Sequence, residues 1–237
     1  PNWLRRETAP SPSTNPASPQ QTFLADSQNN FAWALFGNLG YEFSDQFRVD
    51  ASLRYDRDKR VNTTLTPTAF LPNVPGFPQG ATGQKRRATF DDLQPKVTLS
   101  YQPSDDVTLY GGYSRGFRSG GFNQTGVGAV AGGNGIAGVS DIFKDETAST
   151  FEAGIKTRLL DRKLTLNAAV YNTLSKNSYF FVFLAANSTQ NLGNVPKTRL
   201  QGFELEANFR PSPDVQLNAS VGYTWSDIKE FPDPAAI

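Results

Sequence analysis

One stretch of the sequence decides the fold class: Val215-Gln216-Leu217-Asn218-Ala219-Ser220-Val221-Gly222-Tyr223-Thr224-Trp225-Ser226. Every odd position in it carries an aliphatic or aromatic side chain, and every even position carries a polar residue or glycine. Because successive side chains of a β-strand point to opposite faces, this period of two predicts a strand with one apolar and one polar face. A helix would repeat its apolar positions every three to four residues, and this stretch does not.

The same pattern recurs upstream and groups into hairpins. The polar turn 210–214 joins the stretch above to an alternating segment, 203–209. Three further pairs of alternating segments are residues 31–43 with 47–55, 93–101 with 107–113, and 151–155 with 164–170. Their turns are similarly short, at residues 44–46, 102–106 and 160–162. The sequence therefore predicts an all-β fold, an antiparallel up-and-down meander of about eight strands.

The connections between the hairpins are long. Residues 60–91 are rich in Thr, Pro and Gly, residues 117–147 in Gly, and residues 1–28 in Pro, Ser, Asn and Gln. A shorter polar loop is predicted at 187–195, after a strand that extends toward Leu184. Soluble domains seldom carry structureless loops of about 30 residues. Short turns at one end of the strands and long loops at the other are typical of an outer-membrane β-barrel.

Aromatic residues of the apolar face gather near both ends of the predicted strands. Tyr41, Phe43 and Phe47 lie beside a short turn, whereas Trp33 and Tyr55 lie at the far ends. Two aromatic rows that flank an aliphatic band match the two interfaces of a lipid bilayer. A soluble β-sandwich also alternates and stays open as a second fold, but other elements would then have to cover the apolar face.

The composition removes several classes of function. The 237 residues include no Cys, His or Met, which excludes disulfides, thiolate metal sites and triads that use histidine. A net charge of +1 gives no reason to expect a nucleic acid partner. The longest apolar run, 180–186, is far shorter than the ~20 residues of a membrane helix. The chain begins Pro1-Asn2-Trp3 without a signal peptide, so we expect a processed chain or a section of a longer one.

Three short motifs are better explained by their context than by the chemistry they suggest. Residues 133–138 fit the nucleotide-binding pattern G-x-G-x-x-G, but they lie within a Gly-rich stretch. Residues 226–229 fit the S-x-x-K pattern of acyl-serine enzymes, but they lie at a strand end. Lys85-Arg86-Arg87 is interpreted as a basic run in a long loop, facing solvent or lipopolysaccharide. We therefore expect no enzyme activity, no metal and no cofactor.

The segment Tyr113–Asn123, with the sequence YSRGFRSGGFN, leaves the long-loop end of a predicted strand. One interpretation is structural, a glycine-kinked exit from the sheet. The other is a rim that contacts a solute through Phe117, Arg118, Phe122 and Asn123. In that case the rings would stack on a planar chelate, and Arg118 would pair with its carboxylate or catecholate oxygens.

This segment resembles the Y-x-x-G-F-[KR]-x-G-G-F-N stretch of TonB-dependent outer-membrane receptors. Three other stretches are similar to the same family in the same order: residues 36–46 with 53–55, residues 146–156 with 164–171, and residues 201–206. Each pattern is degenerate alone, whereas four in order on the predicted hairpins are fairly specific. The resemblance extends from Phe23 to Phe231.

The resemblance implies that residues 1–237 are part of a 22-stranded transmembrane β-barrel, with a plug domain that this chain lacks. It places the chain in the outer membrane of a Gram-negative bacterium, against lipid and lipopolysaccharide. The complete receptor would take up ferric siderophores or a similar large, scarce solute. The TonB complex would drive this uptake and would contact the missing N-terminal part.

Other functions stay open beside the uptake receptor. A passive eight-stranded barrel would act as a pore or an anchor, and a soluble β-sandwich would act as a binding module. An outer-membrane enzyme is disfavoured because the sequence has no histidine and no paired catalytic motif.

Overall fold

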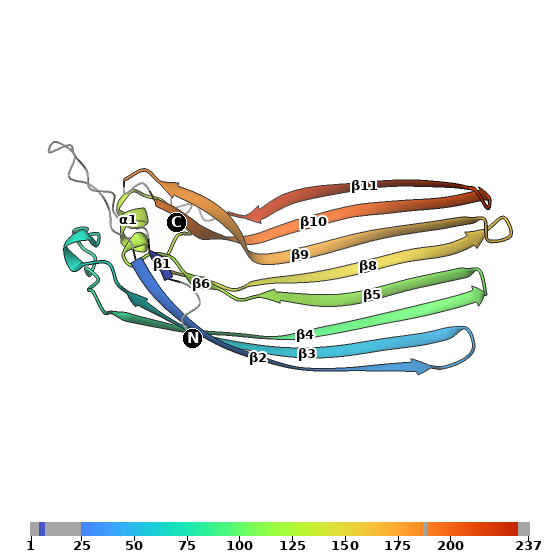
Figure 1. Cartoon of the computed structure of the whole chain (residues 1–237), viewed down its shortest axis with the longest axis horizontal. Coiled ribbons are helices and arrows are strands. Elements are labelled where there is room, and N and C mark those ends of the chain that lie inside the picture. The colour runs from blue at the N-terminus through green and yellow to red at the C-terminus, as the bar shows by residue number, and fades with distance from the viewer. Residues whose placement is uncertain (1–4, 8–24, 187–188, 232–237) are drawn as a thin grey trace.

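The computed structural model describes residues 5–7, 25–186 and 189–231. These residues form one large antiparallel sheet with the strand order β1-β2-β3-β4-β5-β8-β9-β10-β11 (Figure 1). The strands are β1 (Arg5–Glu7), β2 (Ala25–Glu42), β3 (Phe47–Thr64), β4 (Lys85–Ser104), β5 (Val107–Arg118), β8 (Glu146–Leu159), β9 (Leu164–Leu184), β10 (Thr189–Ser212) and β11 (Val215–Glu230). Each strand pairs with its neighbours in chain order, which confirms the predicted meander.

The short turns all lie at one end of this sheet, on the right of Figure 1, and the long connections lie at the other. We call these the short-turn end and the long-loop end. The connection after β5 contains β6 (Gly121–Phe122), helix α1 (Val127–Gly133) and β7 (Ile142–Phe143). The connection after β3 contains the 3-10 helix η1 (Thr68–Phe70). No helix among the described residues is long and apolar enough to cross a membrane.

The strands run further into the long-loop end than the sequence indicates. β3 and β4 stay paired as far as Thr63 and Lys85, so the predicted connection 60–91 shrinks to residues 65–84. The predicted loop 187–195 is wrong, because β10 begins at Thr189 and pairs there with Leu184. Beyond the apolar band the backbone ladder persists without hydrophobic alternation, so the period of two no longer marks the strand.

The two faces of the sheet follow the predicted alternation. Leu53, Leu99, Leu205 and Val221 are exposed, at 37 to 54 % of their surface, and Leu166 is half-buried. We call their side of the sheet the apolar face and the opposite side, with Arg54 and Glu204, the polar face. No described element packs over the apolar face as the second layer of a sandwich would. Exposed apolar surface on this scale indicates a surface that another apolar phase covers.

Conventional hydrophobic burial occurs at the long-loop end. Val127, Val130 and Ala131 of α1 pack with Val139 and with Leu184 at the end of β9. We call these five residues the loop core. Val127 and Ala131 are completely buried, and Leu184 is 1 % exposed. The connection after β5 is therefore a folded unit attached to the strand ends.

Candidate functional site

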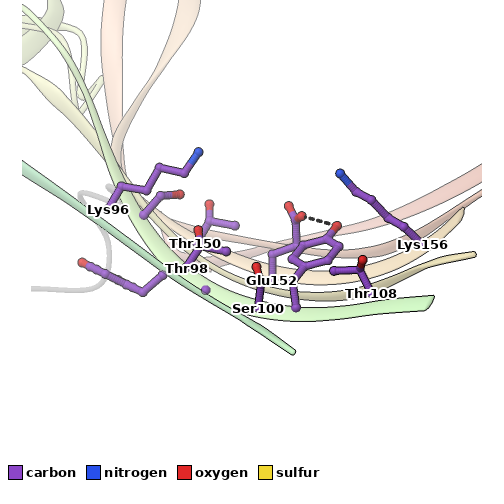
Figure 2. A pocket seen from close by; sticks show the side chains of 11 residues that line it. Lys96, Thr98, Ser100, Thr108, Thr150, Glu152 and Lys156 are labelled. Carbon is purple, nitrogen blue, oxygen red and sulfur yellow. Dashed lines mark hydrogen bonds between the residues drawn. The ribbon is translucent and has the colours of Figure 1, made fainter. Parts of the chain in front are cut away.

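Polar side chains of β4, β5 and β8 line a shallow pocket on the polar face (Figure 2). The phenol of Tyr110 donates a hydrogen bond of 2.8 Å to Oε1 of Glu152. The ammonium of Lys156 lies 5.5 Å from the Tyr110 ring centroid. Hydroxyl groups fill much of the remaining wall, from Thr98, Ser100, Thr108 and Thr150. Such a surface offers both donors and acceptors of hydrogen bonds.

The sheet splits between β4 and β5 toward the long-loop end. Their ladder ends at the pair Lys96 and Ser114, although β4 continues along β3 and β5 continues along β8. Pro95 directly precedes Lys96 on β4, on the side of the long-loop end, and it has no N–H to donate to a ladder. Arg115 reaches across the split to Asp92, with Nη2 at 2.6 Å from Oδ1. An ion pair thus bridges the strands where the backbone ladder stops.

A second pocket lies beside this split, on the long-loop side of the apolar band. Phe117 and Ser119 line it together with Arg54, Asp56 and Asp58 of β3. Arg54 pairs with Asp56, with Nε at 2.6 Å from Oδ2. Oδ2 of Asp58 accepts from Arg60, but its buried Oδ1 has no donor among the described residues. The pocket is therefore lined by an aromatic ring and by paired carboxylates, one of which keeps a buried oxygen with no donor among the described residues.

Arg118 lies at the edge of this region with its side chain 64 % exposed. Its guanidinium stands 4.2 Å from the ring centroid of Tyr179 and 3.5 Å from Oε2 of Glu146. The Tyr179 hydroxyl donates 2.8 Å to the carbonyl of Ser119. Burial raises the pKa of Tyr179 to about 12, and the nearby positive charge of Arg118 opposes that shift. Arg118 is thus held by a ring and a carboxylate, and most of its donors still face solvent.

The predicted ligand residues separate into two pairs. Phe117 lines the second pocket and is half-buried, and Arg118 is exposed at the edge of that pocket. Phe122 is half-buried, and Asn123 is buried. The Asn123 amide donates 2.7 Å to each of the carbonyls of Ser140 and Leu192, and it accepts 2.9 Å from the Leu192 N–H. The geometry gives Asn123 a scaffolding contact between the connection and β10.

The interpretation of Lys85-Arg86-Arg87 as a loop run is wrong. All three residues belong to β4 and pair with residues 61–63 of β3. Lys85 and Arg87 are exposed, whereas Arg86 is buried on the polar face. Sequence reasoning also missed Tyr179 and Asp58. The sequence did contain a sign that Arg86 belongs to a strand. Arg86, Ala88 and Phe90 are even positions, and they continue the alternation of the predicted strand 93–101 toward its N-terminus.

Comparison with known proteins agrees with this geometry. A family model described as "TonB dependent receptor-like, beta-barrel" matches residues 2–236. The chain belongs to this family. Its members are outer-membrane proteins of Gram-negative bacteria, so the apolar face of this TonB-dependent receptor β-barrel section faces the lipid of that membrane, and the polar face lines the barrel lumen.

Individual relatives are similar over most of the chain. It is 26 % identical to "Probable TonB-dependent siderophore receptor PiuA" of Acinetobacter baumannii over 78 % of this chain and 22 % of that protein. It is 26 % identical to "Metal-pseudopaline receptor CntO" of Pseudomonas aeruginosa over 89 % of this chain and 27 % of that protein. The crystal structure of the ferric yersiniabactin uptake receptor FyuA from Yersinia pestis has the same fold. Its TM-score is 0.63 at 20 % identity, over 91 % of this chain and 30 % of that one.

The chain thus spans about a quarter of the length of the curated relatives it matches. It corresponds to one arc of the barrel wall. The sandwich and passive-barrel alternatives gain no support from these relatives, which are transport receptors.

Proposed function

We propose that the complete receptor takes up a ferric siderophore, or a similar large and scarce chelate, with energy from the TonB complex. The observation that carries this proposal is the family match over residues 2–236 on a sheet whose faces separate lipid from lumen. A probable siderophore receptor and a metal-pseudopaline receptor are among its relatives by name. The proposal includes a 22-stranded barrel of which this chain forms one section, a plug domain outside this chain, and contact of TonB with the N-terminal part of the complete receptor.

Within this function the present arc binds and guides, and it has no catalytic role. Phe117 and Arg118 are the proposed solute contacts, because Phe117 lines the second pocket and Arg118 is exposed beside it at the long-loop end. The Phe117 ring offers a flat apolar surface to a chelate, and the unsatisfied donors of Arg118 suit its anionic oxygens. Phe122 and Asn123 are proposed to shape this rim from within. The apolar face contacts lipid, and exposed Lys85 and Arg87 are proposed to face lipopolysaccharide phosphates.

Uptake experiments test the transport class directly. Cells that express the full-length receptor are given radioiron complexes of desferrioxamine B, a hydroxamate, or enterobactin, a catecholate. We expect saturable uptake of one complex that disappears when TonB is deleted. Uptake that persists without TonB would identify a passive pore instead. Absence of receptor-dependent uptake of both complexes would contradict the assignment to these two siderophore classes.

A matched pair of arginines tests the contact residues. Arg118→Ala is expected to weaken binding of the transported complex about tenfold or more, the scale of one charge-assisted hydrogen bond. Arg162→Ala is the control, because Arg162 is similarly exposed and also pairs with one carboxylate, Asp106, but at the short-turn end. Equal affinities of the two variants, with normal surface expression, would leave Arg118 a structural role only.

A further inference from the structure

Arg86 stands out because a strand residue of the barrel wall buries its charge against a loop. Its side chain is 8 % exposed. Among the described residues, Arg86 and Asp58 are the charged residues that are buried. Burying a guanidinium is costly unless its donors find acceptors. What Arg86 contacts therefore indicates what the burial achieves.

The contacts come from the sheet and from the connection after β5 at once. Nη2 donates 2.7 Å to Oδ1 of Asn62, its cross-strand neighbour on β3. Nη1 donates 3.0 Å to the backbone carbonyl of Asp141. Carboxylate oxygens of Asp26 and Asp141 lie at 3.7 and 3.9 Å. The guanidinium carbon lies 5.3 Å from the centroid of the Phe122 ring.

Phe122 and Asp141 lie at the neck of the connection. β6 and β7 pair through Phe122 with Ile142 and close residues 123–141 into one loop. The Asp141 carboxylate also accepts from the N–H groups of Gly126 and Gly128, at 2.7 and 2.8 Å, where α1 begins. The Arg86 side chain of β4 thus contacts both ends of the loop, and Asp141 links it to the first turn of α1.

We propose that Arg86 is a positioning residue for the connection after β5, residues 119–145. It clamps the neck of this connection, at Phe122 and Asp141, onto the polar face and so places the solute rim. The inference rests on the proposed function only for its effect on the solute. The clamp can be released because its bonding is incomplete: Nε of Arg86 is buried with no acceptor among the described residues, and both carboxylates lie beyond hydrogen-bond distance. On the other side, Asn123 holds the same loop to β10.

Hydrogen–deuterium exchange of the full-length receptor in lipid nanodiscs tests the clamp without any solute. Arg86→Gln is expected to speed amide exchange of residues 121–143 roughly ten- to hundredfold, the scale of a lost charge-assisted bond. Residues 93–102 of β4 should exchange as in the wild type. Arg86→Lys, which keeps the charge and loses the planar fork, should fall between the two.

Arg87→Gln is the matched control, since Arg87 is the next residue, carries the same charge and is exposed. Unchanged exchange in Arg86→Gln, or an equal change in Arg87→Gln, would overturn the clamp. If Arg86→Gln does not assemble, Asn62→Ala removes one acceptor from an intact Arg86, and it should still raise exchange several-fold in 121–143 alone; no rise there overturns the clamp as well.

Radioiron binding then separates positioning from clamping. Arg86→Gln should weaken binding of the transported complex although Arg118 is intact, and Arg86→Lys should restore binding in part. Faster loop exchange with unchanged affinity would confirm the clamp and overturn its positioning role. A receptor that transports neither iron complex would fail the proposed function, while the exchange result would still decide the clamp.

Discussion

Two leucines show how differently the two ends of this molecule are stabilised. Leu184, at the long-loop end of β9, is 1 % exposed and packs in the loop core. Leu217, near the short-turn end of β11, is 57 % exposed on the apolar face. The long-loop end is organised like a small soluble protein around its own core. The sheet below it is one layer thick and relies on lipid to cover its apolar side chains.

β9 passes through both environments without interruption. Val170 lies on the apolar face and is exposed, whereas Leu184, fourteen residues further along the same strand, is buried by protein. Because β9 is one strand on both sides of this boundary, its membrane part fixes where its long-loop part lies. What changes at the boundary is the covering phase, and a single substitution should therefore have different consequences on its two sides.

The largest expected effect comes from Leu184→Ala. Removing a fully buried leucine from a packed core costs about 2–5 kcal/mol. Because the loop core is confined to the long-loop end, the loss should appear as faster hydrogen exchange in residues 127–139, with the β2–β3 hairpin unchanged. Leu217→Ala, the same substitution on the lipid side, should cost only about 0.5 kcal/mol of apolar transfer. Similar losses for both variants would break the comparison.

A charge on the lipid side should cost slightly less than the loop-core cavity. Val221→Arg places a cation near the middle of β11 on the apolar face, at about 2–4 kcal/mol for a midplane position. Ser220→Arg places the same cation on the polar face, where Ser220 pairs with Glu206 across the ladder. Folding of the full-length receptor into lipid vesicles, followed by urea titration, measures both. Equal destabilisation would contradict the assignment of the faces.

The sequence predicts the membrane half well because one physical rule operates there. Alternation at 47–55 and 215–226 follows from lipid on one side and lumen on the other, and the turns follow from polar residues between. The long-loop end escapes the rule. Asn191 is buried in a strand that looks like a polar loop, because its backbone pairs with Val182 of β9; its side-chain amide bonds locally, to Thr189.

The candidate site is also only partly predictable, for the same reason. A local motif predicts Arg118 as a contact residue, and its side chain is exposed. The burial of Arg86 depends on Asp141, 55 residues away, and the packing of Val130 depends on Leu184. No local pattern encodes contacts of that range. A Gly-rich composition at 117–147 resembles a flexible loop, although its glycines allow close packing: a Cβ on Gly120 would collide with the carbonyl oxygen of Phe143.

The smallest effect concerns the hydroxyl by which Tyr179 holds the backbone of Ser119 at the boundary between the two ends. Its pKa is raised to about 12 from a usual value near 10. When its hydrogen bond to Ser119 is broken, the Tyr179 hydroxyl ionises at a lower pH than when the bond is formed. The stabilisation from this bond is therefore complete below pH 10 and is lost as the pH rises from 10 to 12. A nitroxide on Gly132→Cys, an exposed position of α1, should report rising mobility over that range.

Tyr179→Phe removes one hydrogen bond, about 0.5–1.5 kcal/mol. It should therefore raise mobility at neutral pH and abolish the alkaline step, whereas Tyr223→Phe on the lipid side should leave both unchanged. An alkaline step that survives in Tyr179→Phe would assign the titration to another group and leave the boundary held by Arg86 and Asn123.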